Sequence, residues 1–494
     1  MEKVAIIELN ENVLRLTIYK VVGAKNTIAL TQSQPFALGK EIEMNELLSP
    51  STKNELLNIL KVYRKMIESY GASKIIALAS NVLTRARNYR GFIDEIYNNT
   101  GINMMIMSDE EQIKYLFNSV VNSIDNPKGV FVYVGNYVSY VVKYNRRAIL
   151  GSEVLPFGSY NAIAEGADLD QSIKELKKKI NVKELIGEGE EEISYVGVGN
   201  AFLSLGKLHK KIARYPLDID NNYTVTKEGL DSTYNFIKGL ELDKIRKIKG
   251  INYDDADKIA GGLAVIKAIY EALNISEVCI SSANIRNGAF IQNIVLACQE
   301  RFSDLLTSSL ENFYEFNKNE FSVNDLVYNM AIILFKQLKV MHKLPRYYVK
   351  PLRIAAFMYD SGKAINAEDY IKHGFSKIVY SGINGVSHRE LLIAGFICTC
   401  QNLDEFSLNE WIKYKDILTD EDLDAVRKLG VIVKLAVALN ASHKPIVQDI
   451  VCDILGESII MKTVVEGDAS YEILEGMKVA QDYRKVYKKS LQII

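Results

Sequence analysis

Short apolar runs divide the N-terminal part of the chain into predicted strands. The runs at 3–9 and 13–20 are rich in β-branched residues and are separated by the polar segment 10–12, so they predict a hairpin that opens a sheet. The runs at 129–135 and 139–145 repeat this pattern. Because alternating strand and helix patterns follow each hairpin, the sequence predicts two similar α/β halves.

The segments that follow the hairpins include both helical and strand patterns. A helical pattern at 90–101 ends at Gly101, and glycine commonly closes helices. After the second half, helical periodicity dominates to about residue 440, and strand character returns at 444–467. Further helices are predicted at 53–70, 202–213 and 256–273, and further strands at 74–80, 103–108, 193–201 and 277–283.

Length and charge narrow the class of protein. The 494 residues exceed what one hydrophobic core normally serves, so we expect several domains. Lys plus Arg (60) balance Asp plus Glu (61), so no overall field favours nucleic acid or an anionic membrane. No apolar stretch approaches the roughly 20 residues of a membrane span, and the first residues do not resemble a leader. We therefore expect a cytoplasmic protein without membrane or nucleic-acid partners.

A series of motifs, in order along the chain, resembles the exopolyphosphatase and guanosine pentaphosphate phosphohydrolase family. The family's first loop, DLGSNSFRL, corresponds to ELNENVLRL at 8–16, and its second loop, DIGGGSTE, corresponds to YVGNYVSY at 133–140. Its third loop, GTGGT, is similar to GVGNA at 197–201. Other segments that resemble the family are ASNVLTRARNYRGF (79–92), SDEEQIKYL (108–116), LPFG (155–158), ADKIAGGLAVI (256–266) and SSANIRNG (281–288).

The resemblance implies a fold and a domain organisation. The implied fold class is α/β, with two actin-like (ribonuclease H-like) ATPase lobes, each built on a five-stranded sheet, followed by a helical HD-like domain and a small α+β region. The expected boundaries are 1–125 and 126–300 for the lobes, 301–440 for the helical domain and 441–494 for the tail. A homodimer is also implied, in line with an apolar helical surface.

The loops of the actin-like scheme grip phosphates through turn amides, while a nearby carboxylate holds the metal. The resemblance therefore implies Mg²⁺ with Glu8 as its protein ligand. Glu11 departs from the family pattern, since a carboxylate near a phosphate repels it. For Gly197 and Gly199, a tight turn without anion binding is the alternative reading. The implied phosphate-binding positions are Asn10, Glu11, Asn12, Arg85, Gly135, Asn136, Gly197, Gly199 and Asn200.

The catalytic positions depart further from the family. The family base falls on Gln112, whose amide cannot take a proton from water. Glu111 is the alternative base, but the spacing from Ser108 to Glu111 is also that of a helix capping box, which would make Glu111 structural. The family's phosphate-binding arginine falls on Thr84, with Arg85 beside it, and the second-loop aspartate falls on Tyr133.

The helical region lacks the ligands that metal-dependent HD proteins need. The His-Asp pair of that fold reads Tyr359-Asp360 here, and the earlier histidine falls near Asn324. Phenol and amide groups are poor replacements for imidazole. We therefore expect no metal in this region.

Two functions remain open. Because loss of a general base costs about 10²–10⁴-fold in rate, we expect a phosphate-ligand-binding or regulatory protein that hydrolyses poorly. The alternative is an active Mg²⁺-dependent hydrolase that releases terminal phosphate. In both cases the implied ligands are polyphosphate and a guanine nucleotide alarmone. An actin-like kinase or cell-shape ATPase shares the loops, but the segment SSANIRNG and the helical region argue against it.

Overall fold

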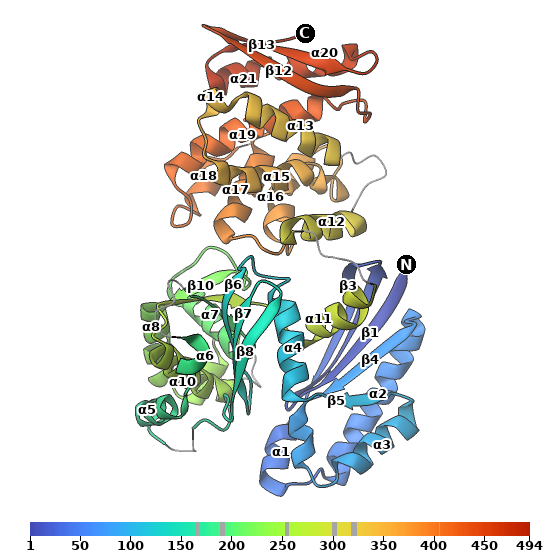
Figure 1. Ribbon diagram of the computed structural model, residues 1–494, viewed down its shortest axis with the longest axis vertical. Helices are drawn as coiled ribbons and strands as arrows, with labels where there is room; N and C mark the ends of the chain where they lie inside the picture. The colour runs from blue at the N-terminus through green and yellow to red at the C-terminus, as the bar shows by residue number, and fades with distance from the viewer. Residues whose placement is uncertain (164–166, 188–192, 252–255, 299–303, 318–323, 405) are drawn as a thin grey trace. The chain divides into compact units, whose positions relative to one another are not determined.

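The computed structural model describes residues 1–163, 167–187, 193–251, 256–298, 304–317, 324–404 and 406–494. The chain divides into two compact units, Met1–Leu305 and Leu306–Ile494. Each unit has its own layers of helices and strands (Figure 1).

The first sheet of unit 1 grows from the first predicted hairpin, with strand order β3-β2-β1-β4-β5. The hairpin strands are antiparallel, whereas β4 and β5 join in parallel. The sequence prediction missed β3, since this edge strand is largely exposed and lacks an apolar alternation. The strands are β1 (Glu2–Leu9), β2 (Val13–Val22), β3 (Lys25–Pro35), β4 (Lys74–Ala79) and β5 (Met104–Ile106).

The second sheet repeats this arrangement, with strand order β10-β11-β9-β6-β7-β8. An antiparallel meander is again followed by two parallel strands. The short strand β10 adds a sixth member at the edge, so this sheet differs from the five-stranded sheet that was predicted. The strands are β6 (Lys128–Val134), β7 (Ser139–Asn145), β8 (Ala148–Leu155), β9 (Ser194–Val198), β10 (Tyr223–Thr226) and β11 (Glu277–Ser281).

Helices cover both faces of the two sheets, which explains why the central strands are continuous apolar runs. The first sheet packs against α1 (Leu38–Asn45), α2 (Pro50–Tyr70) and α3 (Tyr89–Thr100). The second packs against α5 (Leu169–Lys179), α7 (Asn200–Ile212), α8 (Lys227–Lys238) and α10 (Ala256–Leu273). Between the sheets lie α4 (Asp109–Val120) and α11 (Ile285–Phe290). Shorter elements are η1 (Asn81–Arg85), α6 (Lys183–Ile186) and α9 (Leu242–Arg246).

Close contact between α4 and α11 depends on a glycine. A Cβ atom at Gly288 would lie 1.7 Å from the carbonyl oxygen of Tyr115, so any other residue would push the helices apart. This contact matters for the site, because α11 and the segment before it form one wall of the cleft described below.

Unit 2 is a helical bundle with a small α+β region. Its centre is α17 (His388–Thr399), which is buried along most of its length. The strands β12 (Val447–Leu455), β13 (Ser458–Val465) and β14 (Ser490–Ile493) form a separate sheet. The other helices are α12 (Leu305–Asn317), α13 (Asn324–Gln337), α14 (Lys339–His342), α15 (Val349–Phe357), α16 (Tyr370–Val379), α18 (Leu408–Ile412), α19 (Asp420–Ala438), α20 (Ser470–Lys478) and α21 (Ala480–Tyr487).

The HD-like positions of unit 2 are buried together. Asn324 Nδ2 lies 3.4 Å from Asp360 Oδ1. Tyr359, the residue before Asp360, is also buried. Within the described part of the chain, no three His, Cys, Asp or Glu side chains converge as a metal site. A search of the same residues found no helix with the length and apolarity that crossing a bilayer requires.

Candidate functional site

A cleft of about 420 Å³ lies in unit 1. The β1–β2 turn, the β6–β7 turn, the start of α7 and the segment 282–286 form its walls, so the duplicated hairpins bring two distant turns together. Of the described lining residues, three are cationic and two are acidic, a formal surplus of one positive charge. These are Arg15, Lys258 and Arg286, with Glu8 and Glu11.

The first turn is held by its own side chains. Asn10 Oδ1 accepts from the backbone N–H of Asn12 at 2.9 Å and of Val13 at 2.8 Å. Asparagine favours such turns because its side chain replaces a backbone acceptor. Asn12, oriented to satisfy both ends of its amide, accepts from Asn136 Nδ2 at 2.8 Å and from Lys258 Nζ at 3.1 Å.

Glu11 lies between the two turns. Ser80 Oγ donates to Glu11 Oε1, and Asn136 Nδ2 donates to Glu11 Oε2 at 3.1 Å. Its backbone oxygen accepts from the N–H of Gly39 at 2.8 Å. Both carboxylate oxygens are therefore bonded within the protein. We call Asn10, Glu11, Asn12, Asn136 and Lys258 the turn side of the cleft.

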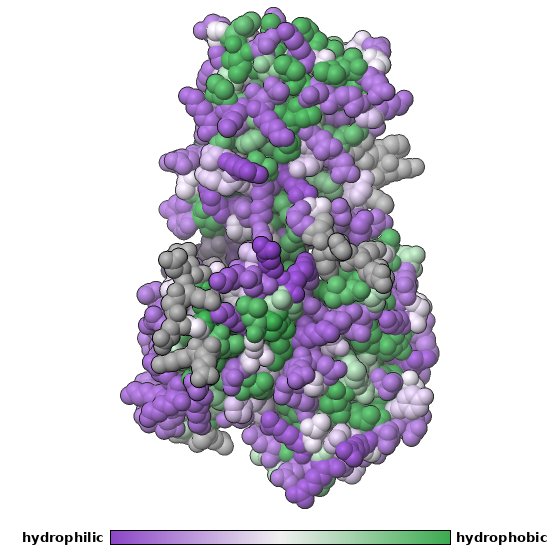
Figure 2. Space-filling model, viewed as in Figure 1, coloured by the Kyte–Doolittle hydropathy of each residue, from purple (hydrophilic) through white to green (hydrophobic). Residues whose placement is uncertain are grey.

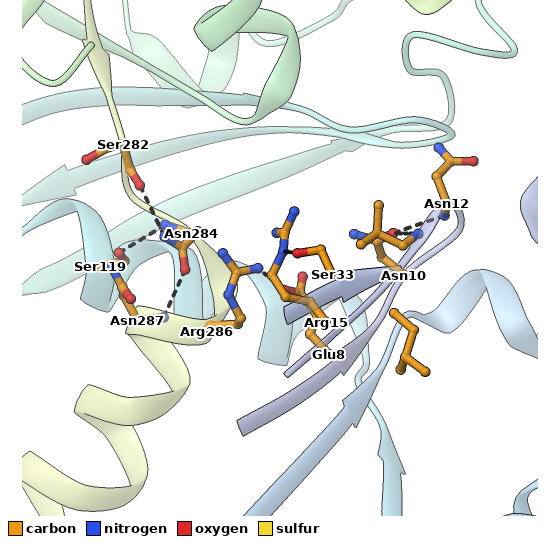
Figure 3. A network of polar contacts seen from close by, with 12 residues as sticks. Glu8, Asn10, Asn12, Arg15, Ser33, Ser119, Ser282, Asn284, Arg286 and Asn287 are labelled. Atoms are coloured by element: carbon orange, nitrogen blue, oxygen red, sulfur yellow. Dashed lines mark hydrogen bonds and ion pairs between the residues drawn. The ribbon is translucent and has the colours of Figure 1, made fainter. Parts of the chain in front are cut away.

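The opposite wall holds an ion pair. Arg286 Nη1 contacts Glu8 Oε2, and the two side chains are only 15% and 8% exposed. Arg15 Nε donates to Ser33 Oγ at 2.8 Å, and Figure 3 shows both guanidinium groups beside Glu8. We call Glu8, Arg15, Ser33 and Arg286 the arginine side.

Strand β6, which leads into the second turn, carries an aromatic ring at Tyr133, where the sequence comparison predicted a carboxylate in the family. Tyr133 stacks on Tyr140 with ring centroids 5.5 Å apart. Burial raises the pKa of Tyr133 far above its usual range, and the charges of Glu11 and Glu8 raise it further, so the phenol stays neutral. Gly135 N–H donates to the carbonyl of Val138 at 3.0 Å and is thus part of the hairpin turn.

The two glycines at the junction of β9 and α7, Gly197 and Gly199, have different roles. A Cβ atom at Gly197 would lie 2.2 Å from the ring of Phe202, which makes this glycine a packing requirement. Gly199 has a φ of +98°, a region that favours glycine, and it precedes Asn200, the first residue of α7. Gly199 and Asn200 line the cleft, whereas Gly197 lies behind it in β9.

Comparison with known proteins identifies the family. The model of the Ppx/GppA phosphatase family matches residues 17–296, which is more than half of the chain. The chain belongs to this family. A bifunctional 3-dehydroquinate synthase/phosphatase of Fusobacterium nucleatum is 24% identical over 311 residues, which cover 59% of this chain and 46% of that protein. The chain therefore matches about half the length of this relative.

Solved structures share the fold. The Ppx/GppA family member of Aquifex aeolicus superposes with a TM-score of 0.53 at 20% identity, over 61% of this chain and 99% of that one. An exopolyphosphatase of Cytophaga hutchinsonii gives a TM-score of 0.53 at 13% identity, over 59% and 97% of the two chains. The predicted actin-like α/β fold and the family are thereby confirmed, and membership supports an exopolyphosphatase-type function.

Gln112, the predicted position of the family base, does not line the cleft. Gln112 is buried, and its Nε2 atom has no hydrogen-bond partner among the described residues. Glu111 forms the predicted capping box: its N–H donates to Ser108 Oγ at 3.1 Å, and its Oε2 accepts from the Ser108 N–H at 2.8 Å. Neither residue lines the cleft described above.

Arg85 and Thr84 lie at the end of η1, outside the residues that line the cleft. The Arg85 guanidinium lies 5.9 Å from the ring centre of Tyr137 in the second turn. Thr84 Oγ1 donates to the carbonyl of Asn81 at 2.7 Å. The arginine thus contacts an aromatic face on the opposite hairpin.

The lining residues fit a resident Mg²⁺ poorly. Mg²⁺ prefers one or two carboxylates together with water and substrate phosphates. Glu8 is already paired with Arg286, Glu11 accepts from Ser80 and Asn136, and Tyr133 stands where the family pattern has an aspartate. A metal held by Glu8 would have to separate a buried ion pair.

Sequence reasoning missed two residues that shape the cleft. Lys258 is buried, bonds to Asn12, and lies 5.3 Å from the ring centre of Tyr160. Ser80, also buried, bonds to Glu11. A lysine among the apolar residues of a helix was the available signal, because lysine is almost never buried without a partner.

Proposed function

We propose that this chain uses its cleft to bind a phosphate-bearing ligand and acts as a regulatory protein that hydrolyses the ligand poorly or not at all. The observation that carries this proposal is Gln112, because a buried amide at the family base position cannot take a proton from water. The stacked ring of Tyr133, where the family has an aspartate, supports it.

The charges of the cleft favour an anionic ligand. Arg15, Lys258 and Arg286 outnumber the two carboxylates, and the arginines can donate in the forked geometry that suits phosphate. Polyphosphate and a guanine nucleotide alarmone are the ligands we propose. Mg²⁺ would enter with the phosphates of the ligand, since the protein offers Glu8 only as part of an ion pair.

The second candidate function is hydrolysis of a terminal phosphate from polyphosphate or guanosine pentaphosphate. The retained carboxylate of Glu8 favours it, as does Glu111, which lies one residue from the base position. A displaced base would require Glu111 to leave its capping box with Ser108.

The first test is release of phosphate from polyphosphate in the presence of Mg²⁺. We expect release far below the 1–10³ s⁻¹ that is typical of enzymes, together with measurable binding of fluorescent polyphosphate. Arg15→Ala should weaken that binding about tenfold, because a hydrogen bond to a charged group contributes about 1.5–3 kcal/mol. The matched control is Arg64→Ala, since Arg64 pairs with Glu68 on the surface of α2.

Two results would contradict the proposal. Turnover at ordinary enzyme rates that Glu111→Gln abolishes and Gln112→Ala preserves would establish the hydrolase instead. Equal binding by the Arg15→Ala and Arg64→Ala variants would remove the cleft from ligand recognition.

The proposal extends to assembly and location. The protein forms a homodimer in the cytoplasm, without nucleic acid, and its domains have the boundaries 1–125, 126–300, 301–440 and 441–494. Figure 2 shows apolar residues gathered near β12 and β13, and Val451, Leu455 and Val464 there are about half exposed, which supports a protein partner. Sedimentation that finds only monomer at micromolar concentration would contradict the dimer.

A further inference from the structure

The turn side of the cleft has a carboxylate at its centre. Glu11 belongs to the first turn and receives Ser80 Oγ on one oxygen and Asn136 Nδ2 on the other. Ser80 lies at the end of β4 and Asn136 in the β6–β7 turn, so the two donors come from different sheets. A carboxylate that bonds to both sheets fastens one to the other.

Other contacts around Glu11 act in the same direction. Asn12 joins Asn136 and Lys258, both of which belong to the second sheet and its helices. Tyr137, next to Asn136, is buried against α1 of the first sheet: a Cβ atom added at Gly39 would lie 2.5 Å from its ring and 2.9 Å from the Glu11 Cβ atom. Tyr137 of the second turn therefore packs against α1 in a space that exists only because residue 39 is glycine.

A carboxylate and a phosphate compete for the same donors. Both present oxygens that accept from N–H and O–H groups, and charged acceptors form the stronger hydrogen bonds. Because the carboxylate is attached to the turn, its effective concentration at these donors is high. A free ligand has to compete with it for the same hydrogen bonds. Its negative charge also repels an incoming phosphate.

We infer that the Glu11 carboxylate takes the place of a ligand phosphate between the two turns and keeps the two lobes closed when no ligand is bound. This inference rests on the proposed function, because it concerns the regulation of the same cleft. A phosphate chain cannot pass between the turns until Glu11 leaves, so ligands of the unmodified protein are confined to the arginine side.

The test measures lobe closure directly. Spin labels on the exposed positions Asn99 in α3 and Lys178 in α5 report the distance between the lobes in the full chain. We expect one closed distance for the unmodified protein, unchanged by sodium tripolyphosphate. Glu11→Ser removes both hydrogen bonds and should raise the open population about tenfold or more, and tripolyphosphate should restore closure. Glu11→Gln keeps the size of the side chain but removes its charge, so it should raise the open population less than Glu11→Ser does.

A second pair of variants covers the case in which Glu11→Ser fails to fold. Gly39→Ala pushes on Tyr137 and Glu11 without altering a charged group, and should also raise the open population. Gly91→Ala in α3 meets nothing within 4 Å and is the control.

Two outcomes would overturn the inference. In the first, Glu11→Ser and Gly39→Ala remain as closed as the unmodified protein without ligand. In the second, the unmodified protein is open and closes when tripolyphosphate is added. Neither outcome decides the proposed function, because phosphate release and polyphosphate binding are measured separately.

Discussion

The two sides of the cleft differ in how they satisfy their polar groups. On the turn side, amides and one carboxylate bond to one another across the two hairpins. On the arginine side, two guanidinium groups lie beside the single carboxylate of Glu8 (Figure 3). On the turn side, the polar groups are therefore satisfied within the protein, as they would be by a bound ligand. The arginine side has more cations than carboxylates and can attract an anionic ligand.

The two sides also differ in formal charge: the arginine side has two cations and one carboxylate, whereas the turn side has one cation, Lys258, and one carboxylate, Glu11. Arg15 corresponds to the arginine of the family's first motif, DLGSNSFRL, whereas Glu11 and Tyr133 correspond to a serine and an aspartate of the first and second motifs. Side chains of the turn side also connect the two sheets, so their replacement has a structural effect besides the chemical one.

The largest expected effect comes from breaking the arginine side. Arg286→Ala removes the ion-pair partner of the buried Glu8 carboxylate but leaves Arg15 beside it, so the cost should approach without reaching the about 3–5 kcal/mol of a fully unpaired buried charge. Urea unfolding should show this loss in the free energy of unfolding of unit 1. Replacing both residues with similar apolar ones should recover much of it, because an unpaired charge is then no longer buried.

An exposed ion pair is the control for this measurement. Arg87 and Glu46 contact each other with side chains that are 76% and 60% exposed, so Arg87→Ala should cost about 0–1 kcal/mol. Equal losses for Arg87→Ala and Arg286→Ala would mean that the arginine side is as well solvated as the surface.

Local patterns predicted the two hairpins and the helices α2, α3, α7 and α10 of unit 1, together with the capping box of α4, because alternation and caps depend on nearby residues. Strands β3, β8 and β10 were missed: β3 and β8 are largely exposed, β10 has only four residues, and the order of all three follows from pairing with a neighbour. In the site, the motif positions of Glu11 and Asn136 were found from sequence. The bonds of Glu11 to Ser80 and Asn136 were not, because they form only after the two sheets come together.

The next expected effect concerns the predicted catalytic positions Thr84, Gln112 and Tyr133. Thr84→Arg, Gln112→Glu and Tyr133→Asp together restore the family's arginine, base and carboxylate, and should raise phosphate release about tenfold or more above the unmodified protein. Each change alone should do little: a base without a metal carboxylate leaves the developing charge unneutralised, and without the arginine the substrate is poorly oriented. Groups that act as a unit are non-additive.

The combination with Glu11→Ser sharpens this prediction. If the triple variant is silent but becomes active with Glu11→Ser, the carboxylate between the turns is the remaining block. If both are silent, the side chains of Asn136 and Tyr137, which follow Gly135 where the family has glycines, are the next obstacles. Full recovery from one change alone would contradict the view that the three positions act together.

The smallest expected effect separates the two predicted roles of Glu111, as part of the α4 capping box or as a base. Ser108→Ala removes the hydroxyl that caps α4 and should destabilise unit 1 by about 1 kcal/mol in urea unfolding. Glu111→Gln keeps an oxygen that can accept from the Ser108 N–H, and glutamine is accepted at this position of a capping box, so stability should hardly change. The same substitution removes the only charge with which Glu111 could act as a base. Unchanged stability with unchanged phosphate release therefore assigns Glu111 to the cap, whereas unchanged stability with loss of a measurable release would make it a base that the family pattern places one residue later.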